Sequence, residues 1–143
     1  MIAPLTSDSR MIPFLEEKVV SSDPIERFAA AFFLAKYQAD SASLLSSARD
    51  VLRMHQGKIE HAGTKDKALM TVIRADNGSD FSLLAEVACA DSNEWLRARA
   101  LGALVEKAKI GNVQARAYIE QIRDQSGFAD TRDRAKMHLE KLR

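Results

Sequence analysis

Glycine, proline, cysteine and aromatic residues are all scarce in this chain of 143 residues. It contains 6 glycines, 3 prolines and 1 cysteine, and aromatic side chains make up 6% of it. The single cysteine, Cys89, excludes an internal disulfide and a cysteine-rich zinc module. Because turn residues are few and runs of β-branched residues are nearly absent, strands joined by tight turns are not expected. The composition therefore favours helices.

The chain also lacks an excess of one charge and a long apolar run. Lys and Arg number 21 against 20 Asp and Glu, so bulk attraction to nucleic acid or to an anionic membrane is not expected. No apolar run approaches the roughly 18 residues of a membrane span, and the first residues do not resemble a secretory signal. Together these absences predict a cytoplasmic protein whose residues 1–143 form a single domain.

What the chain does have is a helical periodicity along its whole length. Apolar residues at three- and four-residue spacing predict helices over residues 8–20, 24–38, 42–55, 65–76, 80–89, 93–109, 113–125 and 131–142. Asp23, Asp91 and Asp130 are the expected N-cap residues of three of them, with Thr64 as a weaker cap of a fourth. Pro24 follows Asp23 at the first helical position, which is where proline is favoured.

One short phrase occurs four times: a basic residue, an alanine three residues later, and Leu or Val after four more. The copies are Arg27/Ala30/Leu34, Lys65/Ala68/Val72, Arg97/Ala100/Leu104 and Arg132/Ala135/Leu139. Each follows a shorter apolar segment, so the repeating unit is a helical hairpin of about 35 residues. A hairpin buries its apolar face only by stacking on another. The alternative is a generic helical bundle in which the phrase recurs by chance.

Two segments carry this pattern most clearly: MIPFLEEKVVSSDPIERFAAAFFLAKYQ (11–38) and DFSLLAEVACADSNEWLRARALGALVEKA (80–108). They resemble HEAT repeats of the armadillo-type superfamily. Residues 43–76 depart from the pattern by a longer linker and by lysine in place of arginine, and residues 113–142 lack the Leu-Leu pair. The resemblance implies an all-α fold, a right-handed α-α superhelix or short solenoid of about four hairpins, at about 9–38, 42–76, 80–109 and 113–142.

In that family the second helices of the hairpins line a concave face. If the repeat alanine points into the core, the position two residues later points towards solvent, because successive helical residues are about 100° apart. A row of large apolar side chains with one arginine is therefore expected along this face. The expected partner-binding residues are Phe28, Phe32, Met70, Trp95, Arg99 and Met137.

Contiguous apolar patches that contain Trp, Met and Arg are typical of protein interfaces, so the row predicts a protein partner. Trp95 is the strongest candidate because it lies beside a helix start. The alternative is that the row packs on itself. That alternative is strongest for Phe28 and Phe32, because helix 24–38 is apolar nearly all round and can be covered by the N-terminal segment or by a dimer partner.

The residue types of catalysis and metal binding form no recognisable motif. His55, Glu60 and His61 lie in a linker at a spacing that matches no helical pair of metal ligands. Cys89 lies on an apolar helix, where thiols are usually inert, and His138 is expected to be a partly buried packing residue. We therefore expect no catalytic residue, no metal site and no cofactor.

The four basic residues of the repeat are expected to form a ladder of ion pairs with turn carboxylates between neighbouring hairpins. The alternative is that they form a row that binds the phosphate groups of a nucleic acid. These residues are Arg27, Lys65, Arg97 and Arg132.

The expected function is a non-enzymatic protein-binding module. An immunity protein, an inhibitor and an adaptor are versions that the sequence does not distinguish. A first repeat without a polar cap also allows self-association through that end. The alternative is nucleic-acid binding by analogy with the DNA-glycosylase branch of HEAT-like proteins. The excess of basic residues on the expected concave side is thin for such a binder.

Overall fold

The computed structural model describes residues 13–35, 41–56 and 58–142, and within them every regular element is helical. A short helical segment covers residues 13–18. The helices that follow are α2 (Pro24–Leu34), α3 (Ser41–Met54), α4 (Ala62–Ala75), the 3-10 turn η1 (Gly78–Asp80), α5 (Phe81–Ala90), α6 (Glu94–Lys109), α7 (Val113–Gln125) and α8 (Ala129–Lys141). The predicted all-α class is confirmed for the described residues.

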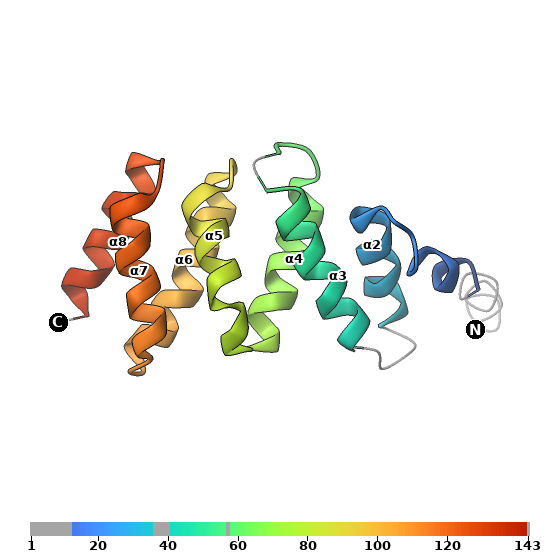
Figure 1. Cartoon of the computed structure of the whole chain (residues 1–143), viewed down its shortest axis with the longest axis horizontal. Coiled ribbons are helices and arrows are strands. Elements are labelled where there is room, and N and C mark those ends of the chain that lie inside the picture. The colour runs from blue at the N-terminus through green and yellow to red at the C-terminus, as the bar shows by residue number, and fades with distance from the viewer. Residues whose placement is uncertain (1–12, 36–40, 57, 143) are drawn as a thin grey trace, which may run out of the picture.

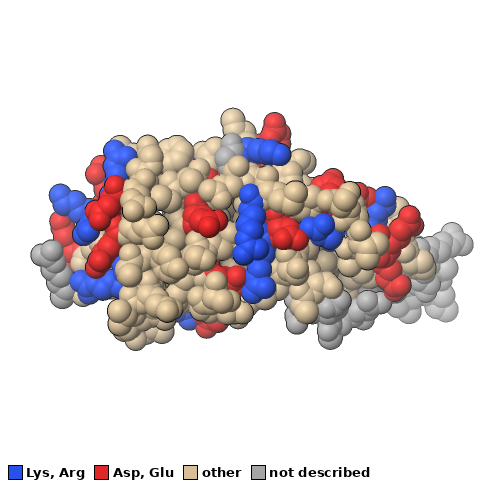
Figure 2. All heavy atoms as spheres, viewed as in Figure 1, with Lys and Arg blue, Asp and Glu red and all other residues tan. Residues whose placement is uncertain are grey.

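The helices pack in chain order and form two layers. α3, α5 and α7 contact one another in sequence, and α2, α4, α6 and α8 do the same in the second layer. Figure 1 shows the resulting row, with the segment 13–18 and α8 at opposite ends of it. The pairs α3–α4, α5–α6 and α7–α8 are consistent with the predicted hairpins. Basic and acidic side chains are interspersed over the face shown in Figure 2.

Helix starts show where local sequence signals succeed and fail. Asp23 caps α2 as predicted, since its carboxylate accepts a hydrogen bond from the N–H two residues on at 3.0 Å. The other predicted caps are wrong. Asn93 rather than Asp91 caps α6, and α8 and α4 begin before Asp130 and Thr64. Asp91 and Asp130 instead form ion pairs between hairpins, which a local pattern does not reveal.

One continuous core runs from α2 to α8. Three of the repeat alanines and the larger residues that follow them lie in it, which confirms the packing role predicted for the phrase. They are Ala68, Ala100, Ala135, Val72, Leu104 and Leu139. No helix of the described residues combines the length and the apolar character needed to cross a membrane.

Candidate functional site

The residues of the predicted row all lie on the α2, α4, α6 and α8 layer, but their exposure differs. Trp95, in the first turn of α6, is 76% exposed, and Met137 of α8 is 44% exposed. Phe32 and Met70 are half-buried. Of the predicted apolar row, two large side chains are therefore well exposed and two are only partly accessible.

The prediction is wrong for Phe28, which is 1% exposed and belongs to the main core. Helix α2 is buried on two sides. The Phe28 ring lies in the main core, 5.8 Å from the ring of Phe32 between centroids, while Ala30 and Leu34 pack against Leu15 of the preceding segment. The N-terminal segment thus covers one side of α2, and Phe28 is not available to a partner.

Charged side chains on this layer are paired across neighbouring helices. Arg99 Nη1 of α6 lies 3.3 Å from Asp66 Oδ1 of α4. Lys67 Nζ of α4 lies 5.5 Å from the centroid of the Phe32 ring of α2. Exposed contacts of this kind contribute only about 0–1 kcal/mol each to stability. Their larger consequence is that a binding partner would meet an Arg99 side chain that is already paired with the Asp66 carboxylate.

The predicted ladder of basic residues is present between the hairpins. Arg27 Nη2 lies 2.6 Å from Asp50 Oδ2 of α3, and Arg97 Nη2 lies 3.4 Å from Asp130 Oδ2 of α8. Lys65 Nζ lies 2.9 Å from a carboxylate oxygen in the turn between α5 and α6. Three of the four basic residues therefore join their own hairpin to the next, as predicted, but only one of the carboxylates lies in a turn, since Asp50 and Asp130 lie in α3 and α8.

The same basic residues also hold the turns of their own hairpins. Arg27, Arg97 and Arg132 each donate through Nη1 to the carbonyl oxygen six residues earlier, at 3.0, 2.8 and 2.6 Å. Lys65 donates through Nζ to the carbonyl of Lys58 at 2.8 Å. These bonds occupy donors that the alternative interpretation assigned to phosphate.

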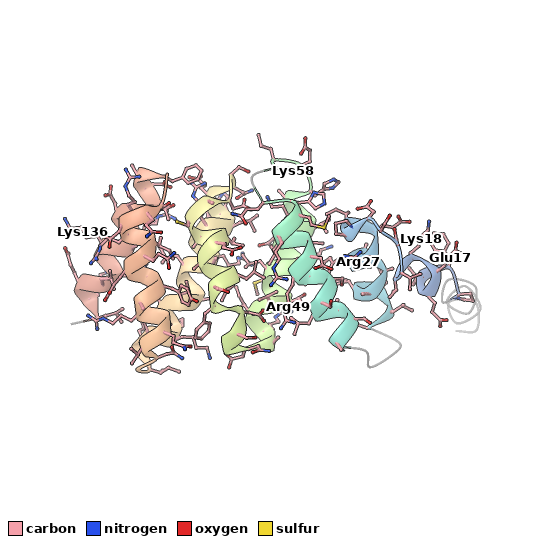
Figure 3. All side chains as sticks on the ribbon, viewed as in Figure 1. Glu17, Lys18, Arg27, Arg49, Lys58 and Lys136 are labelled. Carbon is pink, nitrogen blue, oxygen red and sulfur yellow. The ribbon has the colours of Figure 1, made fainter. Side chains whose placement is uncertain are left out.

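The ladder has one further rung that the repeated phrase does not predict. Arg49 of α3 donates through Nε and Nη2 to the buried carboxylate of Asp80 at 2.8 and 2.9 Å. This hydrogen bonding to Asp80 raises the pKa of Arg49. In Figure 3, Arg27 lies between α2 and α3, and Arg49 lies on the side of α3 that faces α5. Arg49 lies outside the repeated phrase, so only the folded structure brings it to its partner.

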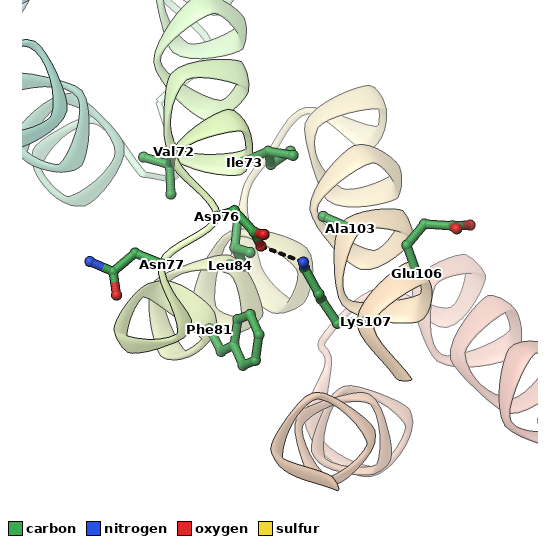
Figure 4. Close-up of a pocket in the computed structure, with 9 residues that line it drawn as sticks. All are labelled: Val72, Ile73, Asp76, Asn77, Phe81, Leu84, Ala103, Glu106 and Lys107. Atoms are coloured by element: carbon green, nitrogen blue, oxygen red, sulfur yellow. Dashed lines mark ion pairs between the residues drawn. The ribbon is translucent and has the colours of Figure 1, made fainter. Parts of the chain in front are cut away.

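A cavity of about 320 Å³ lies between the C-terminal halves of α4 and α6 and the start of α5. Most of its wall is apolar, and an ion pair between Asp76 and Lys107 lies at its rim (Figure 4). Asp76 closes α4 in the left-handed conformation, with φ at +52°. Apolar wall residues include Ile73, Phe81 and Ala103. This cavity has no signal in the sequence, because it exists only once two hairpins have stacked.

The titratable groups that sequence analysis singled out lie away from this cavity. The rings of His55 and His61 are 5.4 Å apart between centroids, edge to face. Burial lowers the pKa of His55 and of His138, and burial raises the pKa of the Cys89 thiol. His138 is half-buried, as predicted. Within the described ranges no three His, Cys, Asp or Glu side chains gather as metal ligands would.

Comparison of the chain with protein-family models, with curated proteins and with solved structures finds no match.

Proposed function

We propose that this protein is a non-enzymatic protein-binding module that uses the surface of the α2, α4, α6 and α8 layer. The observation that carries the proposal is the exposure of Trp95, at 76%. Tryptophan is enriched among the residues that dominate binding energy at interfaces, where its large ring is buried by the partner. Met137 on α8 extends the same layer and is also exposed.

We further propose that the chain is one HEAT-like domain, a short right-handed α-α superhelix whose concave side is this layer. Three features support this architecture: the fourfold phrase, the sequential packing in two layers, and the ion pairs that join consecutive hairpins. The free thiol of the only cysteine, Cys89, fits the cytoplasm. Immunity protein, inhibitor and adaptor remain equal versions of the function.

The charges favour a protein partner over nucleic acid. Nucleic-acid binders neutralise several phosphates with free Lys and Arg side chains. Here Arg27, Lys65 and Arg97 are tied to carboxylates of the next hairpin, and Arg99 is tied to Asp66.

Site-specific photo-crosslinking in the native host tests the proposal. A photoreactive amino acid is placed at Trp95, at Met137 and, as a control, at Val113 of the opposite layer, which is 79% exposed. Specific adducts are expected at the first two positions and not at the third. Equal labelling of all three positions, or no adduct at any, overturns the proposal.

A further inference from the structure

A second cavity, of about 540 Å³, lies between the C-terminal halves of α2 and α4 and the start of α3. Its volume is within the range of roughly 300–1,000 Å³ that is usual for small-molecule sites. Most of the described residues that line it are apolar, namely Phe32, Ala42, Leu44, Leu45 and Ala75. Phe32, Leu44 and Leu45 are only half-buried, so apolar surface is accessible to a ligand here.

The charge at this cavity is positive. Arg74 is the one charged residue among the described residues that line it. Lys67, seven residues earlier, lies on the same face of α4, and its Nζ lies 5.5 Å from the centroid of the Phe32 ring in the cavity wall. Arg74 and Lys67 are both exposed, and neither forms an ion pair within the described ranges. The acidic residues of α4 and its end, Asp66 and Asp76, are paired with Arg99 and Lys107 of α6.

The 320 Å³ cavity beside α6 differs in this respect. Its cation Lys107 is paired with Asp76, and its carboxylate Glu106 is paired with Lys109 at 3.1 Å. The charges at that rim are therefore balanced by the chain itself, whereas Arg74 and Lys67 are left to bind an anion. A guanidinium group binds a carboxylate through two parallel hydrogen bonds, so the ligand that matches the second cavity has a carboxylate and an apolar body.

We propose that the cavity between α2, α3 and α4 binds a small organic carboxylate with an apolar body, such as a medium-chain fatty acid. The hydrocarbon chain lies against Leu44 and Leu45, and the carboxylate lies at the rim, where Arg74 and Lys67 bind it. Burial of the hydrocarbon supplies most of the affinity, because exposed ion pairs contribute little by themselves. This inference is independent of the protein-binding function proposed above, which depends on Trp95 and Met137.

Titration of the full chain with straight-chain carboxylates tests the inference. The probe is octanoate, and the matched controls are hexanoate, acetate and octylammonium. Binding is followed by the amide chemical shifts of Leu45 and Ala75, which line the cavity on different helices. Octanoate is expected to shift both amides along one saturation curve. Hexanoate should bind more weakly, by up to about fourfold for each buried methylene that it lacks, and acetate and octylammonium should not saturate the site.

Charge-removing variants locate the carboxylate. Arg74→Gln and Lys67→Gln change exposed positions, so the fold should be retained, as circular dichroism can verify. Each variant is expected to weaken octanoate binding by about threefold to fivefold, as exposed ion pairs allow. Arg53→Gln is the matched control, because Arg53 is an exposed cation of α3 outside the cavity lining. It should leave the Kd for octanoate unchanged.

Several outcomes overturn the inference. They are no response to octanoate, equal binding of octylammonium, and an affinity that does not depend on chain length. Equal weakening by Arg53→Gln and Arg74→Gln would also overturn it, since net charge rather than this site would then attract the anion. A short peptide that ends in leucine with a free carboxylate is the last comparison. Tighter binding of this peptide than of octanoate would overturn the assignment to a small molecule.

Discussion

Lys65 and Asp91 form an ion pair sealed from solvent between two hairpins. Lys65 Nζ lies 2.9 Å from Asp91 Oδ2, and the two side chains are 1% and 0% exposed. Both charges have further partners, since Lys65 donates to the carbonyl of Lys58 at 2.8 Å and Asp91 Oδ1 accepts from the N–H of Asn93 at 2.9 Å. Two buried charges with this many hydrogen bonds are interdependent, because neither can be left without the other.

Replacing one member of this pair should be far more damaging than replacing both. Lys65→Met leaves the Asp91 carboxylate buried without its cation, and a loss of about 3–5 kcal/mol in the free energy of unfolding is expected. The double variant Lys65→Met/Asp91→Asn should recover a large part of that loss. Urea unfolding monitored by circular dichroism measures the free energy of unfolding of each variant. Arg99→Ala, which breaks an exposed pair, is the control and should cost at most about 1 kcal/mol. Equal losses in the single and double variants would refute the coupling.

Trp95→Ala should weaken binding to the crosslinked partner by about 2 kcal/mol, or roughly 30-fold in Kd, with stability changed by less than about 0.5 kcal/mol. The reason is that an exposed indole contributes little to folding and much to a covered interface. Phe28→Ala is the matched control, because its ring is in the core and its loss should cost about 3–5 kcal/mol of stability. Isothermal titration calorimetry and thermal unfolding give the two readouts. An unstable Trp95→Ala with unaltered affinity would reverse the assignment.

Gly102→Ala should stabilise the fold by about 0.5–1 kcal/mol. Gly102 lies inside α6, and a Cβ added there would meet no atom within 4 Å. Alanine therefore gains helix propensity without a clash. Gly111→Ala is the control, since Gly111 has φ at +94° and a side chain there is strained. Differential scanning calorimetry should show a higher Tm for the first variant and a lower Tm for the second. A lower Tm in both would mean that α6 is covered at Gly102.

Stability should fall as the pH is lowered from about 7.5 to about 5.5. Burial lowers the pKa of His55 and His138 below the value of about 6.5 that these groups have when unfolded. The unfolded chain therefore binds protons before the folded chain does, and stability present above pH of about 6.5 is lost as the pH falls towards the folded pKa. Chemical denaturation at several pH values measures the slope. His55→Gln/His138→Gln should flatten it, and an unchanged slope would assign it to other groups.

The helices and the ladder of basic residues could be predicted from the sequence, but the exposure of the candidate binding residues could be predicted only in part. Helix periodicity and the repeated phrase around Arg97 are local features of the sequence. The helices and the basic residues on them can therefore be predicted from the sequence alone. The burial of Phe28 could not be predicted, because it depends on the residues around Leu15, which cover the opposite side of α2. The partner of Arg49 and the cavity walls beside Ala103 come from different hairpins. Such pairings have no fixed spacing along the chain.

The two-layer packing has a mechanical consequence. Among the described residues, the main helix contacts join helices that are adjacent or two apart in the chain, so the first and last hairpins are linked mainly through those between them. Small rotations at successive junctions therefore add up over the length of the row instead of being cancelled by a closing contact. In the architecture proposed above, a row of this kind would flex along its length around a molecule bound to the α2, α4, α6 and α8 layer.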